Sequence, residues 1–294
     1  MSFTISKRAF LSGTAAAALL GMTAGSARIA VAAAPARQRV PKASLRARTT
    51  PLFRCPEGFP NALSGSPEGL WVGEQKLSGE LARRYGVPEP ADLGECAWLL
   101  DWKTGEVKRT VRTESRNTSG MGVGGGYVWM VANAPPYGVF QTDMESRTVS
   151  HRQVPLGGGG THGAKYRDGK LWIVSTRLRG ILRVDAASWQ PEFMIPYDPS
   201  KRHHDMAFDE NGYIWLVTGD LQSSRYAQGR FGLDKYDPET GERLASLDFE
   251  PGSADPHGLE IHEGEMYSCD AGIHPGWPVN DSPFSGYVFK VELI

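Results

Sequence analysis

Three histidines, His162, His204 and His257, occupy equivalent points of a repeated sequence pattern. Each stands near the start of a stretch that reads as a short strand, a glycine-containing turn and a second strand carrying an aromatic residue. Neutral imidazoles are good ligands for zinc, iron or copper, and three of them leave positions open for water or substrate. We therefore expect a divalent metal on these three histidines. The alternative is a water-filled channel in which they bond only to the backbone and to each other.

Two further copies of the pattern carry Asn61 and Ser119 at the same point. We expect both to contact a substrate beside the histidines. The aromatic residues that mark the five copies are Trp71, Trp129, Trp172, Trp215 and Tyr267. Their spacing fits the blades of a β-propeller, each of which takes about 40–50 residues and forms a four-stranded sheet.

A second pattern supports this interpretation. Four aspartates are each followed three residues later by Thr or Ser, and each lies between two strand-like runs; they are Asp101, Asp143, Asp185 and Asp237. Such side chains cap tight turns by bonding to the backbone. We expect these turns to join the third and fourth strands of each blade.

The fifth copy lacks its outer strand, since Tyr287–Leu293 matches a third strand and the sequence then stops. A strand before the first copy would complete that blade and protect its edges. The prediction is an all-β, five-bladed propeller closed by an N-terminal strand. Six blades are the alternative if 76–94, with an expected helix at Ser78–Tyr85, is not an insertion.

In such a propeller the five marked positions ring one channel mouth, and the loops between second and third strands form its rim. Those loops carry basic and aromatic residues suited to a small-molecule pocket: Arg177, Arg179, Arg225, Arg230 and Trp277. We expect these residues to bind substrate.

Proton transfer is expected from Glu74, Asp270 or His274, which lie near the same mouth. The acids could equally be solvated. Asp205 either orients the neighbouring His204 ring or ends its strand. His203 should point away from the ring, because adjacent residues of a strand face opposite sides.

Composition agrees with a turn-rich β protein. The 294 residues include 35 Gly and 20 Pro, and the net charge of −1 gives no electrostatic case for nucleic acid. The three cysteines allow one disulfide, for which Cys55 and Cys96 are the favoured pair. We expect a monomer with a small-molecule substrate.

Residues 1–36 have the layout of an export signal, with Lys7-Arg8 before an apolar run and small residues up to Ala36. The segment is twin-arginine-like, although Lys7 leaves the ordinary secretion route open. We expect a linker and closing strand at 37–50, the propeller at 51–294, and a periplasmic or secreted protein without a membrane segment after cleavage. An uncleaved anchor is the alternative.

The stretches PHGLEIHEGEMYSCDAG and HDMAFDENGYIWLVTG resemble the repeats of the gluconolactonase/senescence-marker and virginiamycin B lyase-like propellers. The resemblance implies a divalent metal at the channel mouth and lactone hydrolysis or eliminative ring opening. This sequence departs from the lactonase pattern, with Asn61 for Glu, His257 for Asn, and His204-Asp205 for Asp-Gly. A nitrogen-rich set argues against lactonase activity and favours zinc, iron or copper over calcium.

Two functions follow as hypotheses. The first is a secreted metal-dependent lyase or hydrolase acting on a small molecule, whose charge, if negative, the arginines would bind. The second is a non-catalytic propeller that binds a ligand or a partner protein, because the fold hosts both roles.

Overall fold

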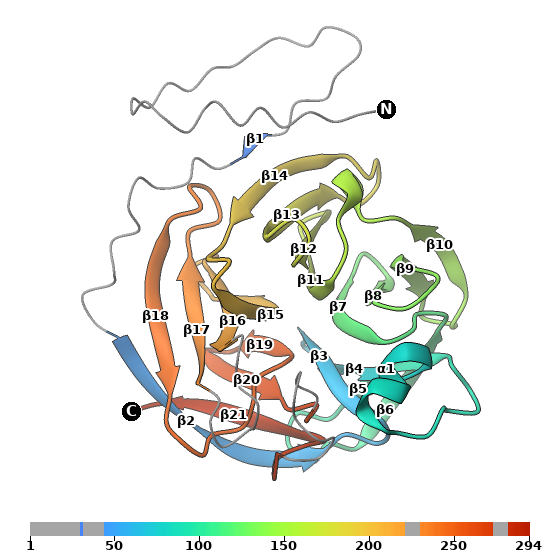
Figure 1. Ribbon diagram of the computed structural model, residues 1–294, viewed down its shortest axis with the longest axis horizontal. Helices are drawn as coiled ribbons and strands as arrows, with labels where there is room; N and C mark the ends of the chain where they lie inside the picture. Colours follow the sequence, from blue (N-terminus) through green and yellow to red (C-terminus); the bar gives the residue numbers. More distant parts are fainter. Residues whose placement is uncertain (1–29, 32–43, 221–229, 273–281) are drawn as a thin grey trace, which may run out of the picture.

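The computed structural model describes residues 30–31, 44–220, 230–272 and 282–294. These residues are almost entirely strands, arranged around a central axis like the sectors of a disc (Figure 1). The expected all-β propeller architecture is therefore confirmed. Among the helices in the described ranges, none is long and apolar enough to cross a membrane.

The strand pairs of the described residues form four sheets. The first contains β3 (Phe59–Ser66), β4 (Gly69–Gln75), β5 (Glu95–Leu100) and β6 (Val107–Thr113). The second contains β7 (Thr118–Gly124), β8 (Tyr127–Ala132), β9 (Gly138–Asp143) and β10 (Thr148–Arg152). The third contains β11 (Thr161–Arg167), β12 (Lys170–Ser175), β13 (Gly180–Asp185) and β14 (Pro191–Pro196), with β1 (Ala30–Val31) parallel to β14.

The fourth sheet has eight strands and joins both ends of the described chain. One half contains β15 (Lys201–Phe208), β16 (Ile214–Asp220), β17 (Phe231–Tyr236) and β18 (Arg243–Phe249). The other half contains β19 (Leu259–His262), β20 (Glu265–Cys269), β21 (Tyr287–Leu293) and β2 (Ser44–Arg54). β2 pairs antiparallel with β21 and parallel with β18, so it lies between them.

The innermost strands β3, β7, β11, β15 and β19 contact one another in a closed cycle around the axis. Their glycines permit this close approach: a side chain at Gly120 or Gly122 would collide with the backbone of β11. Buried tryptophans and aliphatic residues fill the spaces between neighbouring sheets, as with Trp172 and Met206 between the third and fourth.

The turns expected between third and fourth strands are present. Asp101 accepts hydrogen bonds from the backbone N–H of Lys103 (2.9 Å) and Thr104 (3.1 Å), and Asp237 binds the N–H of Glu239 and Thr240 in the same way. These carboxylates satisfy backbone donors that the turn leaves without ladder partners.

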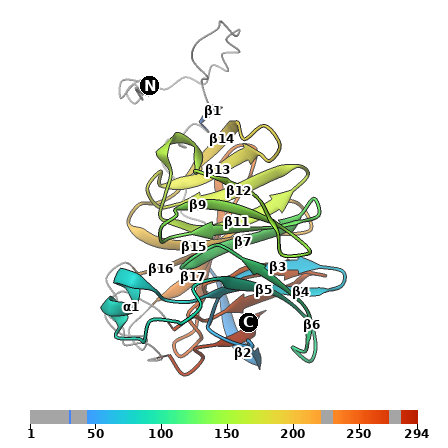
Figure 2. The ribbon, with the colours of Figure 1, turned by 90° about the vertical axis from the view of Figure 1, so that its right-hand side faces the viewer.

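The insertion at 76–94 carries helix α1 (Gly79–Tyr85), which ends at Gly86 with a left-handed φ of 65°. Two reciprocal bonds hold it on the second sheet: Ser78 N–H to Asn117 Oδ1, and Asn117 Nδ2 to Ser78 Oγ, each 3.0 Å. The helix stands on one face of the ring, outside its strands (Figure 2). A short 3₁₀ helix spans Pro155–Gly157.

The cysteines correct one expectation, because all three thiols are free. Cys96 is buried in β5, whereas the Cys55 thiol donates to the carbonyl oxygen of Glu57 (3.1 Å). The Cys269 thiol donates to the carbonyl oxygen of Pro60 (3.2 Å). The favoured Cys55–Cys96 disulfide is not formed.

Candidate functional site

A cavity of about 1160 Å³ opens on the axis, on the face that carries α1. All five positions identified by the repeat line it: Asn61, Ser119, His162, His204 and His257. Four lie near the starts of inner strands, and His257 lies just before β19. We call these five side chains the cavity floor. The repeat works as a guide because each inner strand begins at the same height around the axis.

The three imidazoles of the floor form one row. The ring centroids of His162 and His204 are 4.9 Å apart, and those of His204 and His257 are 4.4 Å apart, with the rings tilted against each other. Strands from three sectors of the ring therefore bring the predicted histidines together.

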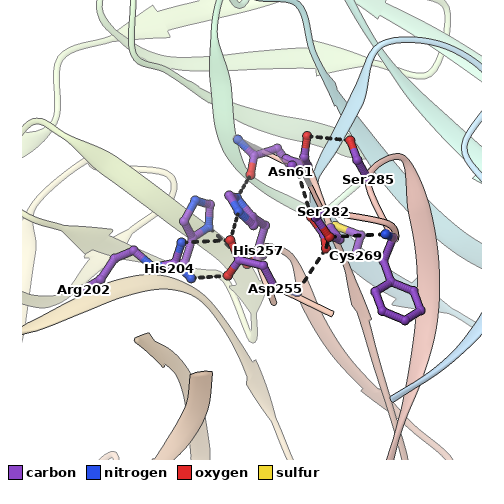
Figure 3. Close-up of polar contacts among 12 residues, drawn as sticks. Asn61, Arg202, His204, Asp255, His257, Cys269, Ser282 and Ser285 are labelled. Atoms are coloured by element: carbon purple, nitrogen blue, oxygen red, sulfur yellow. Dashed lines mark hydrogen bonds and ion pairs between the residues drawn. The ribbon is translucent and has the colours of Figure 1, made fainter. Parts of the chain in front are cut away.

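His257 has a hydrogen-bond acceptor at each ring nitrogen (Figure 3). Its Nδ1 lies 2.9 Å from Asn61 Oδ1, and its Nε2 lies 3.0 Å from Asp255 Oδ2. The Asn61 amide is oriented by its own donor, since Nδ2 donates to the carbonyl oxygen of Thr118 (3.2 Å). Only a doubly protonated ring satisfies both acceptors.

Asp255 is fully buried and binds two cations at once. It accepts both guanidinium N–H groups of Arg202, one at 3.2 Å, in addition to the His257 ring. Burial would raise the pKa of this carboxyl, but Arg202 and His257 together hold its pKa well below the usual range. Asp255 is therefore a carboxylate that fixes positive charge beneath the floor.

His204 has a defined tautomer. Its Nδ1 lies 3.1 Å from the carbonyl oxygen of His257, so Nδ1 carries the proton and Nε2 carries the lone pair. Burial, with the nearby charge of His257, lowers the pKa of His204 well below its ordinary value. Nothing in the described part of the chain bonds its Nε2. His204 thus presents an unused lone pair at neutral pH.

His162 is also neutral at pH 7, because burial lowers its pKa to about 4. Its Nδ1 is buried and has no partner among the residues that the structure describes. A bound ligand would offer this nitrogen the partner that the described residues do not.

The metal site expected on the three histidines does not fit this arrangement. His257 would have to give up its bond to Asn61 or Asp255 before it could offer a lone pair. Within the described ranges, no group of three or more His, Cys, Asp or Glu side chains is placed to hold a metal ion. The floor therefore offers a metal ion two imidazole lone pairs, those of His162 and His204.

The predicted proton-transfer acids lie elsewhere. Glu74 is buried between β4 and β5, where Oε2 accepts the backbone N–H of Cys96 (3.0 Å). Asp270 accepts the N–H of Asp255 (3.0 Å) and the hydroxyl of Ser282 (2.6 Å). Neither lines the cavity. Both instead satisfy backbone donors, so the structure does not bring them to a substrate.

The arginines divide into three groups. Arg177 and Arg179 line the cavity as expected, whereas Arg230 is exposed and does not. Arg225, together with the predicted His274 and Trp277, lies outside the described residues. His203 belongs to a different contact, with its ring stacked on Tyr197 at 3.8 Å, outside the row of imidazoles.

Asp205 does not orient an imidazole. Its Oδ2 lies 3.0 Å from Lys165 Nζ and accepts the backbone N–H of Leu259 (3.1 Å) and Leu63 (3.4 Å). Burial raises the pKa of Asp205 to about 6, and the Lys165 charge opposes this rise. Its partners thus come from three other inner strands.

Sequence reasoning missed the roles of Arg202 and Asp255. Each stands two residues before a floor histidine, and residues two apart in an extended chain share a face. That spacing was the available signal for their presence beneath the floor.

Comparison with known proteins agrees on the fold alone. No family model and no curated protein sequence matches the chain. Among solved structures, the glutaminyl cyclase of Myxococcus xanthus is similar at 12% identity and a TM-score of 0.53, over 85% of this chain and 98% of that chain.

Two further similar structures have lower TM-scores. Hydrazine synthase of Kuenenia stuttgartiensis has 13% identity and a TM-score of 0.47, over 82% of this chain and 64% of that one. A catalytically inactive virginiamycin B lyase from Staphylococcus aureus, with quinupristin, has 16% identity and a TM-score of 0.43, over 82% and 69%. The solved structures that this chain resembles thus include a virginiamycin B lyase, and the likeness is one of fold.

Proposed function

We propose that this propeller is an enzyme, a lyase or hydrolase, that transfers protons to and from a small anionic molecule held over the cavity floor. One observation carries the proposal: the same cavity collects basic side chains without ion-pair partners and two neutral imidazoles with unused nitrogens. Proton transfer is the step that lyases and hydrolases share.

The charge of the cavity supports an anionic substrate. Arg202 and Lys201 are neutralised by Asp255 and Asp234. Four other arginines line the cavity, and none of them has an ion-pair partner in the described part of the chain: Arg84, Arg116, Arg177 and Arg179. The acidic residues in the lining are Glu80 and Glu89, and Glu89 is engaged by the N–H of Gly79.

Proton transfer would fall to His204 and His162. A low pKa makes each a weak base in the empty cavity. An anion beside them would offset the charges of His257 and Arg202, and so raise the pKa of both rings toward neutrality. Substrate binding would thus prepare the Nε2 of His204 to accept a proton.

A second candidate adds a divalent metal, zinc, iron or copper, held by His162 and His204. The buried Nδ1 of His162 favours it, because that nitrogen has no partner among the described residues. Elemental analysis of the purified protein tests this candidate. About one metal per chain, absent from His204→Ala, supports it; a metal-free protein that still binds substrate contradicts it.

A ligand-binding propeller without catalysis is the remaining alternative. It requires the same cavity but no turnover.

For the whole molecule, we propose five blades. The eight-stranded sheet then counts as two blades, and β2 is the outer strand of the last one. We further propose that residues 1–36 direct export to the periplasm or the medium and that the mature protein is a monomer.

Calorimetric titration with citrate, a small carboxylate probe, tests the anion site. We expect binding that weakens with added salt, because the contacts are charged. Arg177→Ala and Arg179→Ala should each weaken it by about tenfold, the loss expected for one charge-assisted hydrogen bond. Arg109→Ala, an exposed arginine of β6 outside the cavity, is the matched control.

Equal losses in all three variants, or no binding by the parent protein, would refute an anion site in this cavity. Mass spectrometry after incubation with carboxylated esters, lactones and sugar acids then separates the reaction classes. Addition of water indicates hydrolysis, and an unsaturated product indicates elimination. Turnover retained in both His204→Gln and His162→Gln would exclude proton transfer by the floor.

A further inference from the structure

An ion pair lies on the axis below the cavity floor. The side chains of Lys165 and Asp205 are 5% and 0% exposed, and Nζ lies 3.0 Å from Oδ2. Lys165 also donates to the carbonyl oxygen of Leu63. Asp205 accepts the backbone N–H groups of Leu63 and Leu259. We call this group the axial pin.

The pin connects four inner strands, β3, β11, β15 and β19. Each of its members lies within three residues of a floor residue that is on the same strand or just before it. Asp205 follows His204, Leu63 and Leu259 lie two residues after Asn61 and His257, and Lys165 lies three residues after His162. A shift of any of these strands along the axis would therefore move the pin and the floor together.

The pin separates two cavities. Neither Lys165 nor Asp205 lines the large cavity, whereas Lys165 lines a smaller one, of about 360 Å³, at a different place. Glu260 lines the same small cavity, with Oε2 4.0 Å from Lys165 Nζ. The pin thus lies below the floor and outside the large cavity.

Stability alone does not explain a charged pair in this position. Taking two charges out of water costs several kcal/mol per ion, and apolar residues of similar volume often stabilise a fold equally well. The best-attested use of a buried polar group is to specify register. The partners of this ion pair are backbone groups of neighbouring strands, and bonds to such groups fix the register of one strand against the next.

We propose that Lys165 and Asp205 are positioning residues: their bonds hold the inner strands in the register that brings the imidazoles of the floor together. The importance of this register for catalysis rests on the function proposed above. The proposed role of the pair in strand register does not depend on that function.

Nuclear magnetic resonance of the histidine side-chain nitrogens tests the proposal in the full-length protein. Lys165→Met removes the ammonium group but keeps an unbranched apolar chain. We expect the ring signals of His162, His204 and His257 to shift, while that of His151, in β10, stays in place. Lys235→Met is the matched control, since Lys235 forms a partly buried ion pair with Asp209 (2.8 Å) away from the floor.

A second variant keeps the result interpretable if Lys165→Met is unstable. In Lys165→Met/Asp205→Leu both charges of the 3.0 Å pair are removed together, so folding should recover. The bonds to Leu63 and Leu259 are nevertheless absent, and the floor signals should still shift. Floor signals unchanged in either folded variant, or unfolding of both, would overturn the proposal, because the pair would then act through stability alone.

Citrate affinity provides the link to function. We expect about tenfold weaker binding in Lys165→Met than in Lys235→Met. If the parent protein does not bind citrate, the proposed anion site fails while the ring signals still decide on the pin.

Discussion

At the scale of single residues, the site depends on charges that face each other below the floor. Asp255 receives Arg202 on one side and His257 on the other, and none of the three is more than slightly exposed. Asp255 therefore decides whether two buried cations are compensated. Loss of the Asp255 carboxylate should therefore reduce the stability of the fold before it affects any reaction.

We expect Asp255→Asn to lower the free energy of unfolding by about 3–5 kcal/mol, the usual cost of removing one partner from a buried ion pair. Urea denaturation measures this change. Asp92→Asn is the control, because Asp92 pairs with Arg112 at the surface (2.8 Å), where ion pairs contribute little. Similar effects in both variants would show that Asp255 is not a buried compensating charge.

At the scale of elements, Glu95 of β5 joins the insertion that carries α1 to the second sheet. It is fully buried, and its oxygens accept the backbone N–H of Lys76 (2.8 Å) and of Thr118 (3.0 Å). Burial raises the pKa of this carboxyl to about 8, against 4.5 for an ordinary glutamate. The folded protein therefore keeps a proton that the unfolded chain has lost.

The contribution of Glu95 to the free energy of unfolding depends on pH. A raised folded-state pKa means that the contribution of Glu95 is greatest below pH 4.5 and is lost as the pH rises to about 8. The slope can reach about 1.4 kcal/mol per pH unit. We expect Glu95→Gln to flatten the decline of unfolding free energy across this range, measured by denaturation at several pH values. An identical slope in the variant would show that another group is responsible.

The repeat predicted much of this arrangement from the sequence. Asn61, Ser119, His162, His204 and His257 could be identified because each blade places its first strand alike around the axis. The contacts below the floor could not be predicted from the sequence. Arg202 meets Asp255, and Lys165 meets Leu63, across long stretches of chain, so no local pattern records them. The role expected of Asp205 was wrong for that reason: its partners come from other strands rather than from its neighbour.

At the scale of the whole molecule, β2 is held on both edges. It pairs with β21 through residues such as Ala47 and Leu293, and with β18 through Leu45 and Leu247. Ala47 is completely buried against the core of the fourth sheet. Without β2, two neighbouring strands would each expose an unpaired edge.

Deletion of residues 44–54 should therefore lower the melting temperature below that of the parent protein and cause aggregation. Thermal denaturation and light scattering provide the comparison. A 44–54 deletion that melts like the parent protein would contradict a structural role for β2.

The position of β2 also determines the order in which the sheets can form during synthesis. A ribosome makes β2 among the first strands described and β21 last, yet the two pair with each other. The first three sheets need only residues that are close in sequence, apart from the short β1, so they can form while translation continues. The half of the fourth sheet that holds β19, β20 and β21 cannot be completed until β21 has been made. The pairing of β2 with β21 is thus a late event in folding, and a chain that ended before β21 would leave β2 without this partner.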